Sequence, residues 1–266
     1  MNFLEAVILG VVQGLTEFLP VSSSGHLVLM QKMFGINEPG LFFDTMLHFG
    51  TLMAVFAVLW KDIWEILKKP VQSLTGFLIL ATIPAVIAAF LFKDVIENIF
   101  ITGKFLGICF IITAALLTAA EKLSRKKTPD NEEKKMNYLD ALVIGLMQAI
   151  AIPPGISRSG ATISGALFRK LDRDFAARFS FLLSIPAILG AVLLQTMDLF
   201  KGAEPTESFN LIAVISGTLS AAITGFFAVK FMIKIIRESS LYGFAIYTGI
   251  LGLLVLLDQY ILRLVF

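Results

Sequence analysis

The chain alternates between long apolar stretches and short polar breaks, a pattern typical of an all-α polytopic membrane protein. A helix needs roughly 20 mostly apolar residues to cross a bilayer. Several stretches approach that length, and flanking residues or local thinning of the bilayer can accommodate the shorter ones. The six predicted spans are residues 41–60, 74–92, 105–120, 175–194, 211–229 and 241–257.

Two further apolar stretches are interrupted by proline and by polar residues. Residues 3–34 are broken at Pro20, and residues 139–168 are broken at Pro153-Pro154. Non-helical backbone is tolerated at membrane depth only where protein or a water-filled cavity covers it. We therefore predict two re-entrant helical hairpins, each returning to its own side of the membrane. The alternative is that each stretch forms two interfacial helices lying flat.

The basic residues divide unequally between the two sides of this topology. Of the 22 lysines and arginines, 16 fall on one side, in the loops spanning 61–69, 122–135, 169–178 and 230–237. Five fall on the other side, and Arg158 lies inside a hairpin. Because loops rich in Lys and Arg stay in the cytoplasm, both termini are predicted to face outward.

Composition supports the membrane assignment. Hydrophobic residues make up 57% of the chain and charged residues 16%, against about 45–50% and about 25% in soluble domains. This balance excludes a soluble enzyme, a disordered chain and a disulfide scaffold. The net charge of +2 gives no field suited to nucleic acid. The lone Cys109 is expected to fill apolar space. The N-terminus carries Glu5 and no basic region, so we expect no cleaved signal peptide.

The two halves of the chain share a weak internal repeat at one fixed offset. Each half holds one hairpin followed by three spans, so the second half must be inserted upside down. Paired broken segments in inverted halves usually meet near the midplane and form a binding site there. We predict a first repeat over 1–120, a charged cytoplasmic linker over 121–138 and a second repeat over 139–266. The matching positions are 8–13 with 143–148, Ser22 with Ser157, Ser24 with Ser159, and Gly25 with Gly160.

The first hairpin tip offers groups for acid–base and nucleophilic chemistry. Gln13 and Glu17 are four residues apart, so a helix would point both side chains the same way. Glu17 suits a base, an acid or a ligand for a divalent cation. His26 follows the run Ser22-Ser23-Ser24-Gly25, so it suits a proton shuttle beside a serine nucleophile. The expected binding residues at this tip are Gln13, Ser22, Ser24 and Gly25.

The second tip offers groups for binding an anion. Its glycines and serines expose backbone N–H groups just before a new helix, an arrangement that favours phosphate. Arg158 adds a planar donor suited to bidentate contact with phosphate. Together the tips predict a phosphate-transfer site. The expected binding residues at this tip are Gly155, Ser157, Ser159, Gly160 and Thr162.

Structural explanations stay open for several of these groups. Glu17 and Arg158 could neutralise each other as a purely structural pair, and the serines could satisfy the broken backbone. His48 lies inside a predicted span without similar neighbours, so we favour a packing or hydrogen-bonding role for it. Asp44, one turn earlier, is either its partner or a group facing a cavity.

The motifs GLTEFLPVSSSGH (14–26) and PGISRSGAT (154–162) resemble the two signature motifs of the undecaprenyl pyrophosphate phosphatase family of the bacitracin-resistance type. Chain length, the number of spans and the sequence Ile185-Pro186-Ala187 agree with this resemblance. The resemblance implies a bacterial plasma-membrane enzyme that removes the terminal phosphate of a polyprenyl pyrophosphate carrier and recycles it for cell-wall synthesis. It also implies dependence on a divalent cation, Mg²⁺ or Ca²⁺, and resistance to bacitracin.

Residue roles follow from the matching motifs. The resemblance implies that Glu17, His26 and Arg158 are catalytic and that Ser23 is the nucleophile, with water as the alternative. Ser157, Ser159 and Thr162 would line the pyrophosphate pocket. The first motif position is Glu or Gln in the family and is Gln13 here, which leaves Glu17 as the only carboxylate ligand in this tip.

Hairpin one is predicted to open outward, which places hydrolysis on the outer face. A transporter or flippase for a polyprenyl phosphate lipid is the rival hypothesis, because inverted repeats with broken helices are typical of transporters. A weaker hypothesis is a resistance factor that only binds the lipid. The sequence leaves open whether the chain forms a homodimer.

Overall fold

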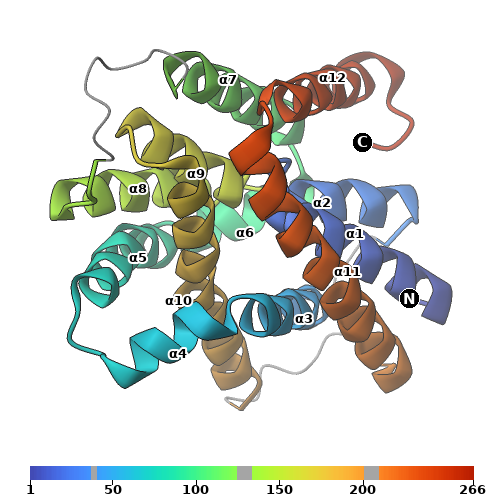
Figure 1. The fold of residues 1–266 in the computed structure, drawn as a ribbon. Helices are drawn as coiled ribbons and strands as arrows, with labels where there is room; N and C mark the ends of the chain where they lie inside the picture. Colours follow the sequence, from blue (N-terminus) through green and yellow to red (C-terminus); the bar gives the residue numbers. More distant parts are fainter. Residues whose placement is uncertain (37–40, 125–133, 201–209) are drawn as a thin grey trace.

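The computed structural model describes residues 1–36, 41–124, 134–200 and 210–266, without the side chains of residue 41 and of 194–200. Over these ranges the regular structure is helical, with no strand (Figure 1). Five helices are long and apolar enough to cross a membrane, and a sixth span results if one bent helix pair counts as a single span. The described chain therefore has the character of a multi-pass membrane protein.

Each of the two interrupted stretches forms a pair of helices. The first pair is α1 (Phe3–Phe18) with α2 (Ser23–Met33), and the second is α8 (Tyr138–Ile150) with α9 (Arg158–Phe168). The breaks contain the prolines that the sequence analysis identified. Every predicted span contains a helix: α3 (Leu41–Val58), α5 (Ser73–Leu91), α7 (Leu106–Ser124), α10 (Arg173–Phe200), α11 (Leu211–Glu238) and α12 (Tyr242–Leu257).

The first of these helices ends two residues before its predicted limit. At Leu59 the chain bends by 80° into α4 (Trp60–Lys68). The Trp60 and Trp64 rings stack with centroids 5.5 Å apart, and Trp and Lys favour the boundary between lipid and water. The sequence analysis also assigned no helix to α6 (Lys93–Thr102) or to the π-helical turn Asp258–Leu262. The predicted linker begins inside α7, and its residues 125–133 lie outside the described part.

The hairpins begin with matching caps. Asn2 caps α1 and Asn137 caps α8, each in a capping box, with Glu5 and Asp140 as the reciprocal partners. Both pairs have the same offset that relates the two hairpin motifs in the sequence repeat. The second helices are also equivalent, because α2 and α9 each have 11 residues and their first residues are related by that offset.

The halves exchange their packing partners. Helix α1 lies along α11, and α8 lies along α5, so each hairpin contacts the second span of the other half. Both contacts are close: a Cβ on Gly10 would lie 2.2 Å from the carbonyl oxygen of Gly217, and a Cβ on Gly145 would lie 2.6 Å from that of Ala81. Helices α7 and α12, the third spans, lie side by side (Figure 1).

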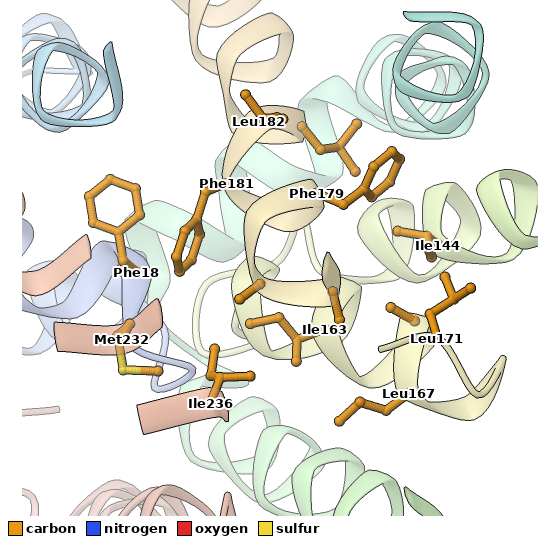
Figure 2. Packing of buried hydrophobic residues seen from close by; sticks show 14 of the residues in the cluster. Phe18, Ile144, Ile163, Leu167, Leu171, Phe179, Phe181, Leu182, Met232 and Ile236 are labelled. Carbon is orange, nitrogen blue, oxygen red and sulfur yellow. The ribbon is translucent and has the colours of Figure 1, made fainter. Parts of the chain in front are cut away.

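A hydrophobic core surrounds the second hairpin and packs against the last residue of α1 in the first hairpin. In Figure 2, side chains from α9 and α10 pack against neighbours from α1, α8 and α11. Phe18, the last residue of α1, meets Phe181 of α10 edge to face, with ring centroids 5.4 Å apart. Both rings are almost fully buried. This contact fixes the end of α1, directly after Glu17.

Candidate active site

The breaks of the two hairpins touch one another. Ser22 and Gly155 both have positive φ, 71° and 96°, and the Gly155 N–H donates to Ser22 Oγ at 3.1 Å. Ser159 Oγ donates to the Leu19 carbonyl at 3.1 Å. The left-handed backbone is easy for Gly155 and uncommon for Ser22. The two motifs, remote in sequence, therefore form one site, in agreement with the predicted tip-to-tip contact.

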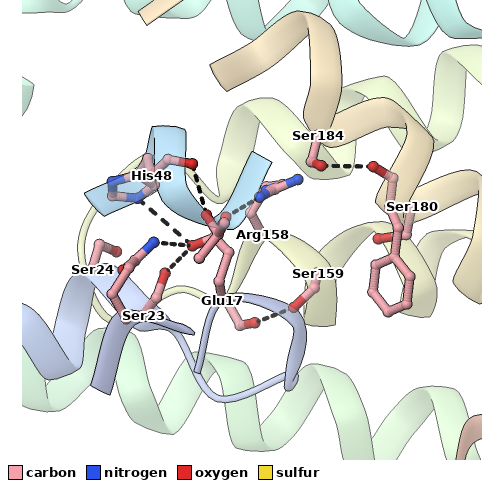
Figure 3. A network of polar contacts seen from close by, with 12 residues as sticks. Glu17, Ser23, Ser24, His48, Arg158, Ser159, Ser180 and Ser184 are labelled. Carbon is pink, nitrogen blue, oxygen red and sulfur yellow. Dashed lines mark hydrogen bonds and ion pairs between the residues drawn. The ribbon is translucent and has the colours of Figure 1, made fainter. Parts of the chain in front are cut away.

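Glu17 is the centre of this site and is 6% exposed. Its Oε2 accepts hydrogen bonds from Gln13 Nε2 at 2.9 Å and from Ser23 Oγ. Its Oε1 forms an ion pair with Arg158 Nη2. Figure 3 shows Ser23 from one hairpin and Arg158 from the other converging on the Glu17 carboxylate. A carboxylate that accepts a serine hydroxyl proton in a hydrogen bond is placed to act as its base.

A cavity of about 300 Å³ opens beside this cluster. Polar and charged groups line one part of it and apolar side chains line the rest, which suits an amphiphile with a polar head. The polar lining consists of Glu17, Ser22, Ser23, Ser24, Asp44, Thr45, His48, Ser157 and Arg158. The apolar lining consists of Leu27, Phe100, Ala151, Ile152, Ile156, Ala187, Ile188 and Ala191.

Two helix N-termini border this cavity. Ser23 is the first residue of α2 and Arg158 is the first residue of α9. The residues before them cap the helices: Ser22 Oγ accepts the Gly25 N–H at 3.3 Å, and Ser157 Oγ accepts the Gly160 N–H at 3.0 Å. Helix N-termini carry a partial positive charge and favour bound anions. With Arg158, they make this end of the cavity suited to phosphate.

The remaining predicted binding residues support the tips without lining the cavity. Gln13 donates a hydrogen bond to Glu17 within α1. Ser159 connects the two hairpins through its hydrogen bond to the Leu19 carbonyl. Thr162 Oγ1 donates to the Arg158 carbonyl at 2.9 Å and lies 2.6 Å from Ser180 Oγ. These contacts hold the backbone of the second tip in place.

His26 lies away from the cavity. Its Nδ1 is 2.7 Å from the Ser22 carbonyl oxygen and its Nε2 is 2.8 Å from the Tyr247 hydroxyl. The ring stacks on Tyr247 and meets Phe110 edge to face. The structure therefore brings Glu17, Ser23 and Arg158 together and places His26 behind the serine turn.

His48 and Asp44 of α3 join the site, although the sequence analysis assigned them no catalytic role. His48 Nε2 lies 3.6 Å from Glu17 Oε2, and its Nδ1 is 2.7 Å from the Asp44 carbonyl oxygen. Asp44 Oδ1 accepts a hydrogen bond from Gln31 Nε2 at 2.7 Å. The sequence feature that could have identified Asp44 and His48 is that two ionisable residues lie inside a predicted span. Ionisable residues are rare there and usually mark a functional site.

The donor set limits how a divalent cation could be held. Among the described residues, no group of three or more His, Cys, Asp or Glu side chains could hold a metal ion. Mg²⁺ often needs only one or two carboxylates, with phosphate oxygens and water completing its shell. Glu17 and Asp44 line the same cavity, so these residues fit a cation that arrives with a phosphate.

Comparison with known proteins assigns the family. The model of the bacitracin resistance protein BacA family matches residues 6–254. The chain belongs to the BacA family. It is 51% identical over 262 residues to undecaprenyl-diphosphatase 3 of Bacillus cereus, covering 98% of both chains. It is also 47% identical over 259 residues to undecaprenyl-diphosphatase of Carboxydothermus hydrogenoformans, covering 97% of this chain and 98% of the relative.

A more distant relative is similar over nearly the whole length of this chain. Undecaprenyl-diphosphatase of Halothermothrix orenii is 42% identical over 259 residues, covering 97% of this chain and 98% of the relative. The family match includes the breaks of both hairpins and every residue that lines the cavity. The site described above therefore lies wholly within the region that defines the BacA family.

Proposed function

We propose that this protein hydrolyses undecaprenyl pyrophosphate to undecaprenyl phosphate and inorganic phosphate. The observation that carries the proposal is that Ser23 and Arg158, at the N-termini of two helices, both contact the buried carboxylate of Glu17. A nucleophile, its base and an arginine thus meet at one cavity. The relatives named undecaprenyl-diphosphatase support this choice of substrate.

The reaction begins at the serine hydroxyl. Ser23 Oγ attacks the terminal phosphorus as Glu17 accepts its proton. A bond forms between Oγ and phosphorus, and the bond from phosphorus to the bridging oxygen breaks. Undecaprenyl phosphate leaves with that oxygen. Glu17 gives its proton to the departing lipid phosphate. Water then attacks the phosphoserine while Glu17 takes a proton from it, and the bond between phosphorus and Oγ breaks. Glu17 passes that proton to Ser23 Oγ, and inorganic phosphate is released.

Arg158 and the helix ends stabilise the negative charge in this reaction. Guanidinium has five N–H donors, so Arg158 can hold Glu17 and phosphate oxygens together. The N-termini of α2 and α9 border the same cavity, and helix N-termini favour bound anions. Fixed donors of this kind stabilise developing charge without reorganising during the reaction.

Glu17 and Asp44 would hold the expected divalent cation, together with phosphate oxygens. When bound, such a cation neutralises phosphate charge and makes the phosphorus easier to attack.

The proposal includes the topology predicted from the sequence. The two helix pairs are re-entrant hairpins of an inverted repeat in the bacterial plasma membrane, both termini face outward, and the site opens to the outer face. The equivalent caps and the reciprocal packing of α1 on α11 and α8 on α5 support the inverted repeat. The product would return to cell-wall synthesis, and its turnover would confer bacitracin resistance.

Purified protein in detergent tests the activity. With undecaprenyl pyrophosphate and Mg²⁺ or Ca²⁺, we expect equal amounts of inorganic phosphate and lipid monophosphate, and we expect EDTA to stop their release. Heat-denatured protein with the same cation is the control for phosphate release that does not depend on the folded protein. Binding of the lipid without release of phosphate would contradict the proposal and favour the transporter hypothesis.

A further inference from the structure

His26 uses both ring nitrogens within the protein. The carbonyl oxygen of Ser22 can only accept a hydrogen bond, so the Nδ1 atom, 2.7 Å away, must carry the hydrogen. In the neutral ring, Nε2 then accepts from the Tyr247 hydroxyl at 2.8 Å. His26 is 8% exposed and lies between the Tyr247 and Phe110 rings. No nitrogen of this ring faces the cavity described above.

The group that His26 holds is the peptide that carries Ser23. The Ser22 carbonyl also accepts the backbone N–H of His26 at 3.2 Å, so His26 holds this oxygen twice. Ser22 itself has a φ of 71°, a value unfavourable for an L-residue. The next residue is Ser23, whose hydroxyl bonds Glu17. A rotation of the Ser22–Ser23 peptide would turn that hydroxyl away from its base.

The Tyr247 side chain holds the histidine from the far side. It comes from α12, 221 residues away in sequence, and its ring stacks on His26 at 5.7 Å with an interplanar angle of 9°. Helix α12 packs along α7, which supplies Phe110. The last span thus joins α7 in enclosing the ring that holds the serine turn.

We propose that His26 and Tyr247 are positioning residues, which fix the peptide before Ser23 so that its hydroxyl faces Glu17. This proposal rests on the proposed function and on Ser23 as the nucleophile. It assigns His26 no proton transfer to or from the substrate, in place of the catalytic role expected from the motif. It gives Tyr247 a role that neither signature motif indicates.

Two His26 variants separate positioning from acid–base catalysis, and a pair of tyrosine variants tests the contact with Tyr247. Asparagine can present an N–H at the place of Nδ1 but cannot titrate, so we expect His26→Asn to keep kcat within about tenfold of wild type. We expect His26→Ala to lose kcat by about 100-fold with KM nearly unchanged, the cost of misplacing a reacting group. Tyr247→Phe should lose kcat several-fold, and the exposed Tyr260→Phe should not.

The kinetic result that overturns the proposal is equal inactivity of folded His26→Asn and His26→Ala, because that outcome assigns the ring a proton transfer. Unchanged kcat in Tyr247→Phe would remove Tyr247 from the proposal. If the wild-type protein releases no phosphate, the proposed function itself fails, so a measurement independent of activity is needed for the histidine.

That measurement is the nitrogen NMR spectrum of protein labelled at histidine. The chain has two histidines, so His48→Gln leaves His26 as the single imidazole signal. We expect the Nδ1–H tautomer, with an Nε2 resonance that shifts in Tyr247→Phe and stays in Tyr260→Phe. An Nε2–H tautomer, or no shift in Tyr247→Phe, would overturn the positioning role whether or not the protein is an active phosphatase.

Discussion

Ser23 and Arg158 occupy equivalent positions in the sequence repeat, as the first residues of two helices of equal length. Both contact the carboxylate of Glu17. The same position in the two hairpins therefore holds a hydroxyl in one and a guanidinium in the other. Under the proposed function, one repeat would supply the nucleophile and the other the positive charge that binds the phosphate.

The geometry of Arg158 should be indispensable, beyond its charge. Arg158→Lys keeps the charge but loses the planar set of donors that can hold Glu17 and phosphate together. We expect kcat/KM for phosphate release to fall by about 100-fold or more, the typical loss when one such donor is removed. Arg237→Lys, at an exposed position, is the matched control. Near-normal turnover in Arg158→Lys would argue against its contact with phosphate.

Adjacent serines provide a test of the nucleophile. Ser23 bonds Glu17, whereas the neighbouring hydroxyl of Ser24 lies 3.4 Å from that of Ser22 and lines the same cavity. We expect Ser23→Ala to reduce turnover by about 10³-fold or more and Ser24→Ala by less than about tenfold. Phosphate release under saturating lipid measures both. Retained activity in Ser23→Ala would instead indicate a water nucleophile.

The equivalent residues also show how far the sequence alone predicts this molecule. The length of the apolar stretches predicted a helix in every span, and the fixed offset between matching motifs predicted that the hairpins correspond. Prolines and the polar residues beside them predicted where the hairpins break. These features are local, because they depend on propensities and spacing within one segment.

The residues that sequence analysis did not assign to the site depend on contacts between distant segments. His48 reaches Glu17 because α3 packs against α1, and Tyr247 reaches His26 across 221 residues. No spacing along the chain encodes either contact. The bend after Val58 was likewise unpredicted, because its apolar run continues through Leu59 and Trp60.

The close contact of α1 with α11 should tolerate no side chain at Gly10. A Cβ there would lie 2.2 Å from the Gly217 carbonyl oxygen, and both helices would have to separate. We expect Gly10→Ala to destabilise the fold by about 1–3 kcal/mol, as overpacking usually does. The measurement is the midpoint of thermal unfolding in detergent. Gly243→Ala, which meets nothing within 4 Å, should not lower that midpoint, and an equal drop in both variants would contradict the argument.

Asp140 should stabilise the linker end of α8. Its buried carboxylate accepts hydrogen bonds from Lys134 Nζ and Arg169 Nε, both at 2.6 Å, and from the Asn137 N–H at 3.0 Å. Burial alone would raise the pKa of Asp140, but these hydrogen bonds hold it below its ordinary value. We therefore expect Asp140→Asn to lower the free energy of unfolding by roughly 1–3 kcal/mol near neutral pH.

The lowered pKa of Asp140 determines how its contribution to the free energy of unfolding changes with pH. A carboxyl group whose pKa is lowered in the folded state stabilises above its unfolded value of about 3.9 and loses that effect as pH falls through the folded value. The difference between wild type and Asp140→Asn should be constant near neutrality and shrink under acid conditions. Asp62→Asn breaks a more exposed pair and should cost less than about 1 kcal/mol. A difference that grows on acidification would contradict the lowered pKa.

The most direct test of the account is a single-turnover comparison of wild type and Glu17→Gln on undecaprenyl pyrophosphate, with lipid binding measured in the same samples. The substitution keeps the size of the side chain and removes the proton acceptor of Ser23. The account predicts one phosphate released per bound lipid by wild type and almost none by Glu17→Gln at equal lipid binding. Equal release by both proteins would contradict the claim that Glu17 activates Ser23 for phosphate transfer.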